Sequence, residues 1–412
     1  MKNNKNYSSY RPLTPEKAVI SLVREWFKNE KEGDMKARER AQLEIKKYLF
    51  ETSDGSYTLQ SDDLGDSRET MHTAYGAYSE AKEKFVNPAC LGGKKKVAIL
   101  DICSGLGINS AAALDYILDS KVNIKVDEIK IDMVEISIET IAASLLIPSP
   151  SESHLIIKKA IETFLIDNHY LEFSHEDKKI PEFLNIQIHC TDAREMVQDI
   201  PRGKYDAIFL DPFSPAKSPE LYTLEFLSIL SSLLKDDGLI LTYTAAAPVR
   251  YALIACGLEV GEGPAMNRSG GTIASRDVNK ISKPLSSHDE RMIALSDAGI
   301  PYRDNKLTDS SNMILERRKK DRIHARGNFK MASTVKTPIY LAQSLEEERT
   351  KRRVLNHLAD LNISDINSQK AKFLVCPQFS SCICNCKQGR SKGSSARVKE
   401  MERRLKLIIK SN

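Results

Sequence analysis

The chain has 412 residues, 41% of them hydrophobic, which is enough for one large domain with additions or for two domains. No segment approaches the roughly 18 consecutive apolar residues of a membrane helix, and the first residues do not resemble a signal peptide. The formal net charge of +5 conceals an asymmetry, because residues 316–412 contain 23 Lys and Arg against 9 Asp and Glu.

This charge distribution leaves residues 1–315 acidic. A basic C-terminal quarter either binds a polyanion through its phosphates or forms a solvated, partly disordered tail. The eight cysteines occur without an export signal, which favours a reducing compartment, so we expect a cytoplasmic protein.

The elements expected along the chain describe an α/β protein. Residues 15–49 have a helical apolar stripe, and a turn at 52–56 separates two short strands of a hairpin. Strands are then expected at 97–102, 129–135, 185–190, 206–211 and 238–244, alternating with helices at 109–118, 138–146, 193–199, 223–235 and 247–256. This alternation predicts a parallel sheet with right-handed crossovers.

We expect three regions. These are a helical N-terminal extension (1–50), the α/β domain (51–320, with an insertion at 150–182) and a basic C-terminal region (321–412). The pattern weakens after residue 277, although residues 398–409 fit a basic amphipathic helix.

A carboxylate and two glycines follow the first core strand, in the pattern Asp101-x-x-x-Gly105-x-Gly107. Glycine permits a positive φ and a close approach of the backbone to a ligand. Ser110 stands where the dinucleotide fingerprint has its third glycine, which disfavours NAD and suits S-adenosylmethionine, a cofactor without a pyrophosphate.

Acids also end the next three strands, namely Glu135, Asp192 (followed by Ala193) and Asp211. In such folds the acid after the second strand accepts hydrogen bonds from both ribose hydroxyls, and an acid after the third can accept one from the adenine amino group. Each acid alone can equally be a helix N-cap. Their occurrence at four successive strand ends favours cofactor binding.

Asp211 is followed by Pro212 and Phe213, which end the strand and begin a proline-rich loop. A primary amine is protonated at neutral pH, and a carboxylate can orient its lone pair toward a methyl group. The pattern therefore indicates that Asp211 orients an amine for methylation. The alternative is that Asp211 only binds the cofactor.

The segment Tyr205–Tyr222, with its Asp-Pro-Phe-Ser-Pro-Ala-Lys sequence, resembles the methyltransferase domain of the MnmC family. The resemblance extends over roughly residues 50–320, including segments 54–59, 69–77, 241–250, 268–274 and 299–304. It implies a Rossmann-like class I fold and methyl transfer from S-adenosylmethionine to the aminomethyl nitrogen of wobble uridine in tRNA, which forms 5-methylaminomethyl-2-thiouridine.

By the same resemblance, Asp211 is the catalytic acid. The residues expected to bind the cofactor are Asp101, Gly105, Gly107, Glu135, Asp192, Ala193 and Met71. Those expected near the acceptor are Glu69, His72, Tyr75, Lys217 and Arg268, although a lone histidine is more often structural. Bifunctional members carry a flavin oxidase domain that this sequence does not indicate, so another enzyme is expected to supply the aminomethyl group.

The basic region contains four cysteines within 11 residues: Cys376, Cys382, Cys384 and Cys386. Alternate residues of an extended segment share a face, so the last three are expected on one side. Two interpretations stay open. Either the four thiols bind zinc or an iron–sulfur cluster, or the cysteines are close in the sequence without binding a metal.

Three other functions remain open. Aminopropyl transfer, as in spermidine synthase, uses this fold but normally has an Asp in the glycine loop, where this chain has Ser104-Gly105-Leu106-Gly107. A small-molecule amine methyltransferase also fits, because the core alone does not reveal the size of the acceptor. The third is a protein with this cofactor-binding fold that binds RNA without catalysis, for which cofactor binding without turnover would be the supporting observation. The basic region favours tRNA as the partner.

Overall fold

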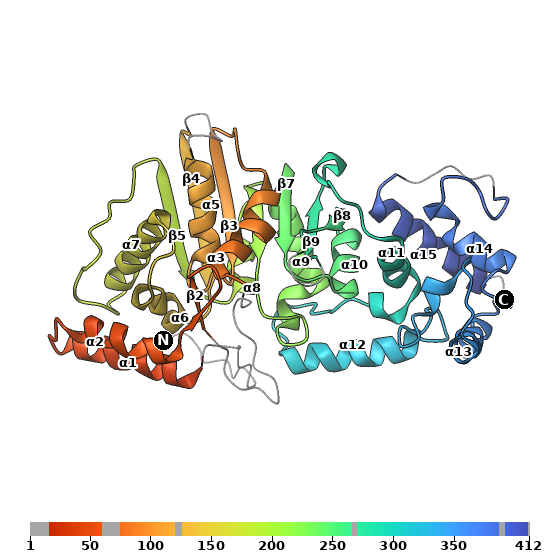
Figure 1. Cartoon of the computed structure of the whole chain (residues 1–412), viewed down its shortest axis with the longest axis horizontal. Coiled ribbons are helices and arrows are strands. Elements are labelled where there is room, and N and C mark those ends of the chain that lie inside the picture. The colour runs from red at the N-terminus through yellow and green to blue at the C-terminus, as the bar shows by residue number, and fades with distance from the viewer. Residues whose placement is uncertain (1–15, 60–74, 120–125, 266–269, 387–391, 411–412) are drawn as a thin grey trace.

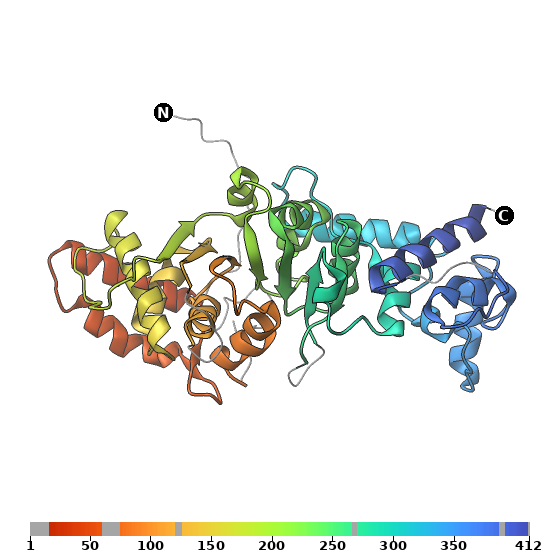
Figure 2. The same ribbon diagram turned by 90° about the horizontal axis from the view of Figure 1, so that it is seen from above.

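The computed structural model describes residues 16–59, 75–119, 126–265, 270–386 and 392–410. A seven-stranded sheet in the order β5-β4-β3-β6-β7-β9-β8 forms the centre of the molecule, and helices cover both of its faces (Figures 1 and 2). The strands of this sheet are β3 (Lys96–Ile102), β4 (Glu128–Glu135), β5 (Leu184–Cys190), β6 (Tyr205–Leu210), β7 (Leu234–Thr242), β8 (Glu259–Glu262) and β9 (Thr272–Ser275). The expected Rossmann-like α/β fold is confirmed.

The five expected core strands are parallel and adjacent, with β3 between β4 and β6. The structure adds two strands that the sequence pattern did not reveal. Strand β9 runs antiparallel to both β7 and β8, so it reverses direction at one side of the sheet. Each has only four residues, too few for a periodic apolar pattern to be recognised.

The helices before and within the α/β core are α1 (Lys17–Lys31), α2 (Ala37–Glu44), α3 (Ala77–Glu80), α4 (Asn87–Ala89), α5 (Ile108–Leu118), α6 (Ile138–Ala143), α7 (Glu152–Asp167), α8 (Ala193–Met196), α9 (Leu224–Leu233) and α10 (Ala247–Ala255). The helix expected at 15–49 is interrupted between α1 and α2, where Gly33 has a φ of +90°. Strands β1 (Phe50–Glu51) and β2 (Tyr57–Thr58) form the expected hairpin. A π-helical turn, Ala81–Val86, joins α3 to α4.

Two hydrophobic clusters lie on opposite faces of the sheet because side chains alternate along each strand. In β3, Val97 and Ile99 face the cluster formed with α1, α2, α5, α6 and α7. Leu100 and Ile102 face the other cluster. Burial on both faces explains why these strands are almost continuously apolar.

The second cluster continues into the C-terminal region, so the alternative of a solvated, disordered tail is wrong for the described residues. The helices here are α11 (Ser287–Leu295), α12 (Ser311–Ala325), α13 (Glu348–Ala359), α14 (Gln369–Val375) and α15 (Ser394–Lys410). Leu358, Leu374 and Leu405 are buried in the same cluster as β6 and α9. The boundary expected at residue 320 falls within α12, and α15 includes the amphipathic helix expected at 398–409.

Much of the basic charge in α12 is used within the fold. Arg318 donates hydrogen bonds to the carbonyl oxygens of Ile300 and Ala298, and Arg322 forms an ion pair with buried Asp297. Lys319 and Lys320, by contrast, are exposed. Only part of the positive charge counted in the sequence is therefore presented to solvent.

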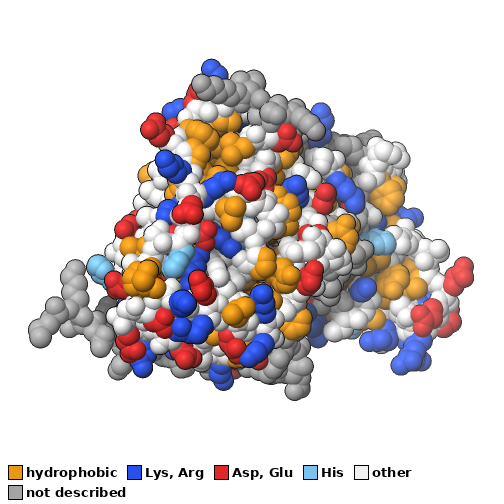
Figure 3. Space-filling view, turned by 60° about the vertical axis from the view of Figure 1, so that its left-hand side comes forward, with side chains coloured by type: hydrophobic (Ala, Val, Ile, Leu, Met, Phe, Trp, Pro, Cys, Tyr) orange, Lys and Arg blue, Asp and Glu red, His pale blue; other side chains and the backbone are white. Residues whose placement is uncertain are grey.

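On the face in Figure 3, acidic and basic side chains are interspersed.

Among the described residues, no helix is both long and apolar enough to cross a membrane.

We predict that α15 is part of the cooperative core. Leu405 is 1% exposed and Leu407 is 43% exposed on the same helix, so they form a matched pair. Leu405→Ala should lower the free energy of unfolding by about 2–5 kcal/mol, because it leaves a cavity. Leu407→Ala should change it by less than about 0.5 kcal/mol. Urea unfolding measures both, and equal effects of the two substitutions would contradict the prediction.

Candidate active site

The turn between β3 and α5 forms the centre of the candidate site. Gly105 and Gly107 have φ values of +53° and +79°, a region that favours glycine. A Cβ on Gly107 would lie 2.8 Å from Ile157 Cγ2 and 3.2 Å from Met133 Cε. The backbone at Gly107 can therefore pass between α7 and β4 only without a side chain.

Asp101 lies beneath this turn and is fully buried. Ser110 Oγ donates a hydrogen bond to Asp101 Oδ2 over 2.6 Å. Burial raises the pKa of Asp101 to about 6. Ser110, which stands in place of the third fingerprint glycine, thus holds Asp101 against the first turn of α5.

Asp211 follows β6 at the adjacent strand end and is partly exposed. Asn109 Nδ2 donates a hydrogen bond to Asp211 Oδ2 over 2.9 Å. Burial raises the pKa of Asp211 to about 8, and the charge of Asp101 adds to this effect. In the ligand-free protein the Asp211 carboxyl group therefore holds its proton near neutral pH.

Glu135 ends β4, on the other side of β3. Its carboxylate accepts hydrogen bonds from the backbone N–H groups of Gly105 (3.3 Å), Ile136 (2.9 Å) and Ser137 (3.1 Å). Burial raises the pKa of Glu135 despite these three donors. Glu135 therefore connects the end of β4 directly to the glycine turn.

Asp192 ends the β5 segment and caps α8, as the N-cap alternative anticipated. It accepts a hydrogen bond from the backbone N–H of Arg194 and pairs with the Arg194 guanidinium at 2.7 Å. Arg194 also reaches Asp304 at 3.2 Å. Ala193 is the first residue of α8. The adenine contact of Asp192 and Ala193 stays a prediction.

The residues expected near the acceptor are only partly described. Tyr75 is 47% exposed, and Lys217 lies in the loop after Asp211, where its N–H donates to the Ser214 carbonyl oxygen at 2.8 Å. Glu69, Met71, His72 and Arg268 lie outside the described residues.

Sequence reasoning missed two polar residues of this edge. Asn109 donates a hydrogen bond to the Asp211 carboxyl group. The position of Asn109 at the start of a helix, directly after a glycine turn, is the sequence signal that could have revealed this role. Glu220, 3% exposed, accepts a hydrogen bond from Ser311 Oγ over 2.8 Å. This bond joins the loop after Asp211 to α12, and no sequence signal connects residues so far apart.

The donor set fits S-adenosylmethionine, the cofactor expected from the sequence. Buried Asp101 Oδ1 and Asn109 Oδ1 accept no hydrogen bond from the described residues, so acceptors remain beside the turn. Carboxylates at adjacent strand ends suit ribose hydroxyls and a positively charged sulfur, but they would repel a pyrophosphate. Asp101, Glu135 and the Gly105–Gly107 backbone are the groups that would hold the cofactor.

The structure also brings the four C-terminal cysteines together. Their Sγ atoms all lie within 4.8 Å of one another.

Comparison with known proteins finds methyltransferase relatives of this chain. A family model described as S-adenosyl-L-methionine-dependent methyltransferase matches residues 154–277. An uncharacterized protein of Methanocaldococcus jannaschii is 33% identical over 316 residues, which cover 76% of this chain and 83% of that protein. The crystal structure of MNMC2 from Aquifex aeolicus matches with a TM-score of 0.53 and 26% identity, covering 74% of this chain and 98% of that one.

The tRNA 5-methylaminomethyl-2-thiouridine biosynthesis bifunctional protein MnmC of Azoarcus sp. is 28% identical over 115 residues. These residues cover 28% of this chain and only 18% of that protein. The residues matched by the family model include β5, β6 and β7, and with them Asp192 and Asp211. The chain belongs to the S-adenosyl-L-methionine-dependent methyltransferases and contains an MnmC-like methyltransferase domain.

Proposed function

We propose that the chain transfers a methyl group from S-adenosylmethionine to the aminomethyl nitrogen of wobble uridine in tRNA. The substrate would be 5-aminomethyl-2-thiouridine and the product 5-methylaminomethyl-2-thiouridine. One observation carries the proposal: a carboxyl group with a strongly raised pKa, Asp211, begins the Asp-Pro-Phe-Ser-Pro-Ala-Lys loop at the strand end beside the glycine turn. The names of the MnmC relatives support the acceptor. We place the reaction in the cytoplasm, where tRNA is modified.

The acceptor amine must lose a proton before it can attack. With a pKa near that of lysine, only about 10⁻³ of such an amine is neutral at pH 7, which costs about 4 kcal/mol. Asp211 can accept a hydrogen bond from the amine and orient its lone pair. Asn109 fixes the Asp211 carboxylate for this role through its hydrogen bond.

The raised pKa of Asp211 suits a site that receives cations. A positive charge near a carboxyl group favours its ionised form, so entry of a cation lowers the pKa of Asp211 and releases its proton. When bound, S-adenosylmethionine supplies an electrophilic methyl group on a positively charged sulfur. Transfer breaks the sulfur–methyl bond and forms the nitrogen–methyl bond, and the amine proton passes to Asp211 or to water.

The phosphates of tRNA require exposed positive charge near the site. Helix α12 is joined to the loop after Asp211 by the bond between Ser311 and Glu220. Its exposed Lys319 and Lys320 are therefore the residues that we propose for phosphate contacts.

We predict that Asp211→Asn abolishes most methyl transfer but preserves cofactor binding. The amide keeps the size of the carboxyl group and an acceptor for Asn109, but it cannot take a proton. Turnover with labelled S-adenosylmethionine and tRNA lacking this methyl group should fall by about 10²–10⁴-fold. The dissociation constant for the cofactor, measured by calorimetry, should change by only a few fold. Asp236→Asn, at a fully exposed acid, is the control. Unchanged turnover of Asp211→Asn would refute the role of Asp211.

The pH dependence of protein stability tests the protonation state of the Asp211 carboxyl group without any substrate. The pKa of this carboxyl group is about 8 in the folded protein, against about 3.9 in an unfolded chain. Between these two pKa values the folded state binds more protons than the unfolded state. The contribution of Asp211 to the free energy of unfolding therefore falls as pH rises. Asp211→Asn should remove this part of the slope. Its stability relative to wild type should increase from about pH 4 and level off above about pH 8, as measured by urea unfolding. A constant difference would contradict the raised pKa.

Charge reversal on α12 tests the tRNA contact. Lys319→Glu with Lys320→Glu should raise KM for tRNA and leave kcat nearly unchanged. The plot of the logarithm of the tRNA association constant against the logarithm of salt concentration should become less steep, its slope decreasing in magnitude by about 2. Lys95→Glu with Lys96→Glu makes the same charge change on exposed lysines at the start of β3, the opposite edge of the sheet. Equal effects of both pairs would show that only total charge matters.

A further inference from the structure

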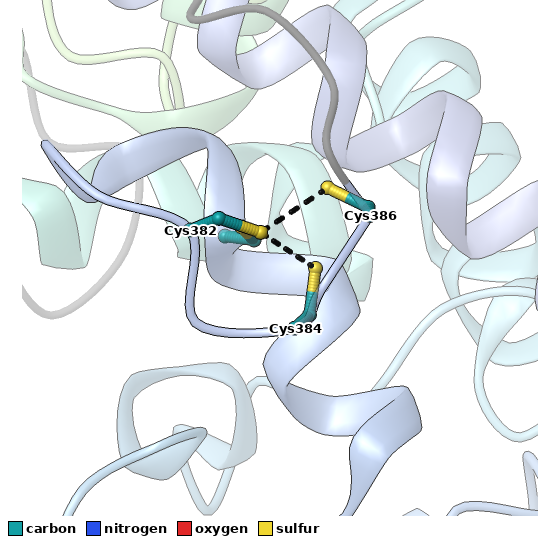
Figure 4. A group of neighbouring side chains, drawn as sticks. Cys382, Cys384 and Cys386 are labelled. Carbon is teal, nitrogen blue, oxygen red and sulfur yellow. Dashed lines mark hydrogen bonds between the residues drawn. The ribbon is translucent and has the colours of Figure 1, made fainter.

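The cysteine cluster lies in the C-terminal helical region, at the end of the molecule opposite α1 and α2 (Figures 1 and 2). Cys376 begins a short 3₁₀ helix directly after α14, and the other three cysteines come from the loop that follows. Cys382, Cys384 and Cys386 point toward one another (Figure 4). The segment that carries them bends, and Asn385 has a φ of +59°, so they meet in a turned loop and not on one face of an extended strand. The feature belongs to a part of the fold that the methyltransferase mechanism does not use.

The spacing of the sulfur atoms matches one tetrahedral ion. Cys382 Sγ lies 3.8 Å from Cys376 Sγ, 4.0 Å from Cys384 Sγ and 3.8 Å from Cys386 Sγ. Four sulfurs bound tetrahedrally to one zinc at 2.3 Å would be separated by about 3.8 Å. In a [4Fe–4S] cluster each cysteine binds a different iron, and in a [2Fe–2S] cluster two cysteines bind each of two irons, so either core holds cysteine sulfurs on different irons farther apart. The observed spacing therefore favours a single ion.

The surroundings of the sulfurs suit a negatively charged site. Cys376 and Cys384 are buried, and none of the four cysteines forms a disulfide with another described residue. Arg404, 1% exposed, donates from Nη2 to Cys386 Sγ at 3.7 Å and from Nη1 to the Phe373 carbonyl oxygen at 2.7 Å. Four thiolates around a divalent ion carry a net charge of −2, which the Arg404 guanidinium partly offsets.

The backbone of the loop is held as well. Gln369, the first residue of α14, donates a hydrogen bond to the Cys384 carbonyl oxygen. The site thus joins three segments: the end of α14, the loop 376–386 and, through Arg404, helix α15.

We propose that Cys376, Cys382, Cys384 and Cys386 bind one zinc ion in a closed tetrahedral site. With four protein ligands the ion has no open coordination position, so its role is structural. It ties α15 to α14, and α15 in turn reaches the sheet edge, where Ser395 Oγ accepts a hydrogen bond from the Val260 N–H at 3.1 Å. Zinc therefore stabilises the basic C-terminal region against the methyltransferase core.

The test measures metal content in the full chain, purified without oxygen and without chelator. We expect one zinc per chain, with neither iron nor acid-labile sulfide. Cys384→Ser and Cys386→Ser should lose the zinc and unfold at a lower temperature. Cys256→Ser, at a partly buried cysteine outside the cluster, should retain it. Stoichiometric iron and sulfide would overturn the proposal.

Cobalt substitution keeps the test independent of whether the variants fold. Wild-type protein stripped by chelator should bind one added Co²⁺ per chain and show the intense visible absorption of tetrahedral cobalt thiolate. Added Zn²⁺ should displace the cobalt and bleach these bands. Absence of the bands, or four cysteines that form disulfides and bind neither ion, would overturn the proposal.

Discussion

The chemistry of the site depends on the crowding of carboxyl groups at one edge of the sheet, where its parallel strands end. Asp101, Glu135 and Asp211 end three adjacent strands, and burial raises the pKa of each. Parallel strands bring their carboxyl ends to the same edge, so residues distant in the sequence become neighbours. A site of this kind disfavours anions and stabilises cations, which is the charge of both the methyl donor and a protonated amine.

The same sheet explains why the C-terminal region belongs to the domain. One hydrophobic cluster runs from β6 and α9 through α11 to α13, α14 and α15. Several arginines that look like tRNA contacts in the sequence are hydrogen-bonded inside this region, among them Arg318, Arg322 and Arg404. Charge counted along the chain therefore overestimates the charge available to a polyanion.

The sequence predicted the elements whose signals are local. Strands buried on both faces, ended by an acid or a glycine turn, gave the positions of β3, β4, β5 and β6 to within one residue. The pairing of Arg194 with Asp304 depends on tertiary folding over 110 residues, whereas its pairing with Asp192 is local. Alternation predicted a common face for Cys382, Cys384 and Cys386, but the loop that brings them together is bent and has a left-handed residue, Asn385. The approach of Cys376 depends on how α14 ends. Strands β8 and β9 were too short to be recognised.

The central claim is that Asp211 holds a proton until a cation enters the site. Calorimetric titration at pH 7 in buffers of different ionisation enthalpy measures the protons released on binding. S-adenosylmethionine and S-adenosylhomocysteine differ by the positively charged sulfur, so they form a matched pair of ligands. The account predicts proton release with S-adenosylmethionine, less release with S-adenosylhomocysteine, and loss of this difference in Asp211→Asn. Equal proton release for the two ligands in the wild-type protein would contradict it.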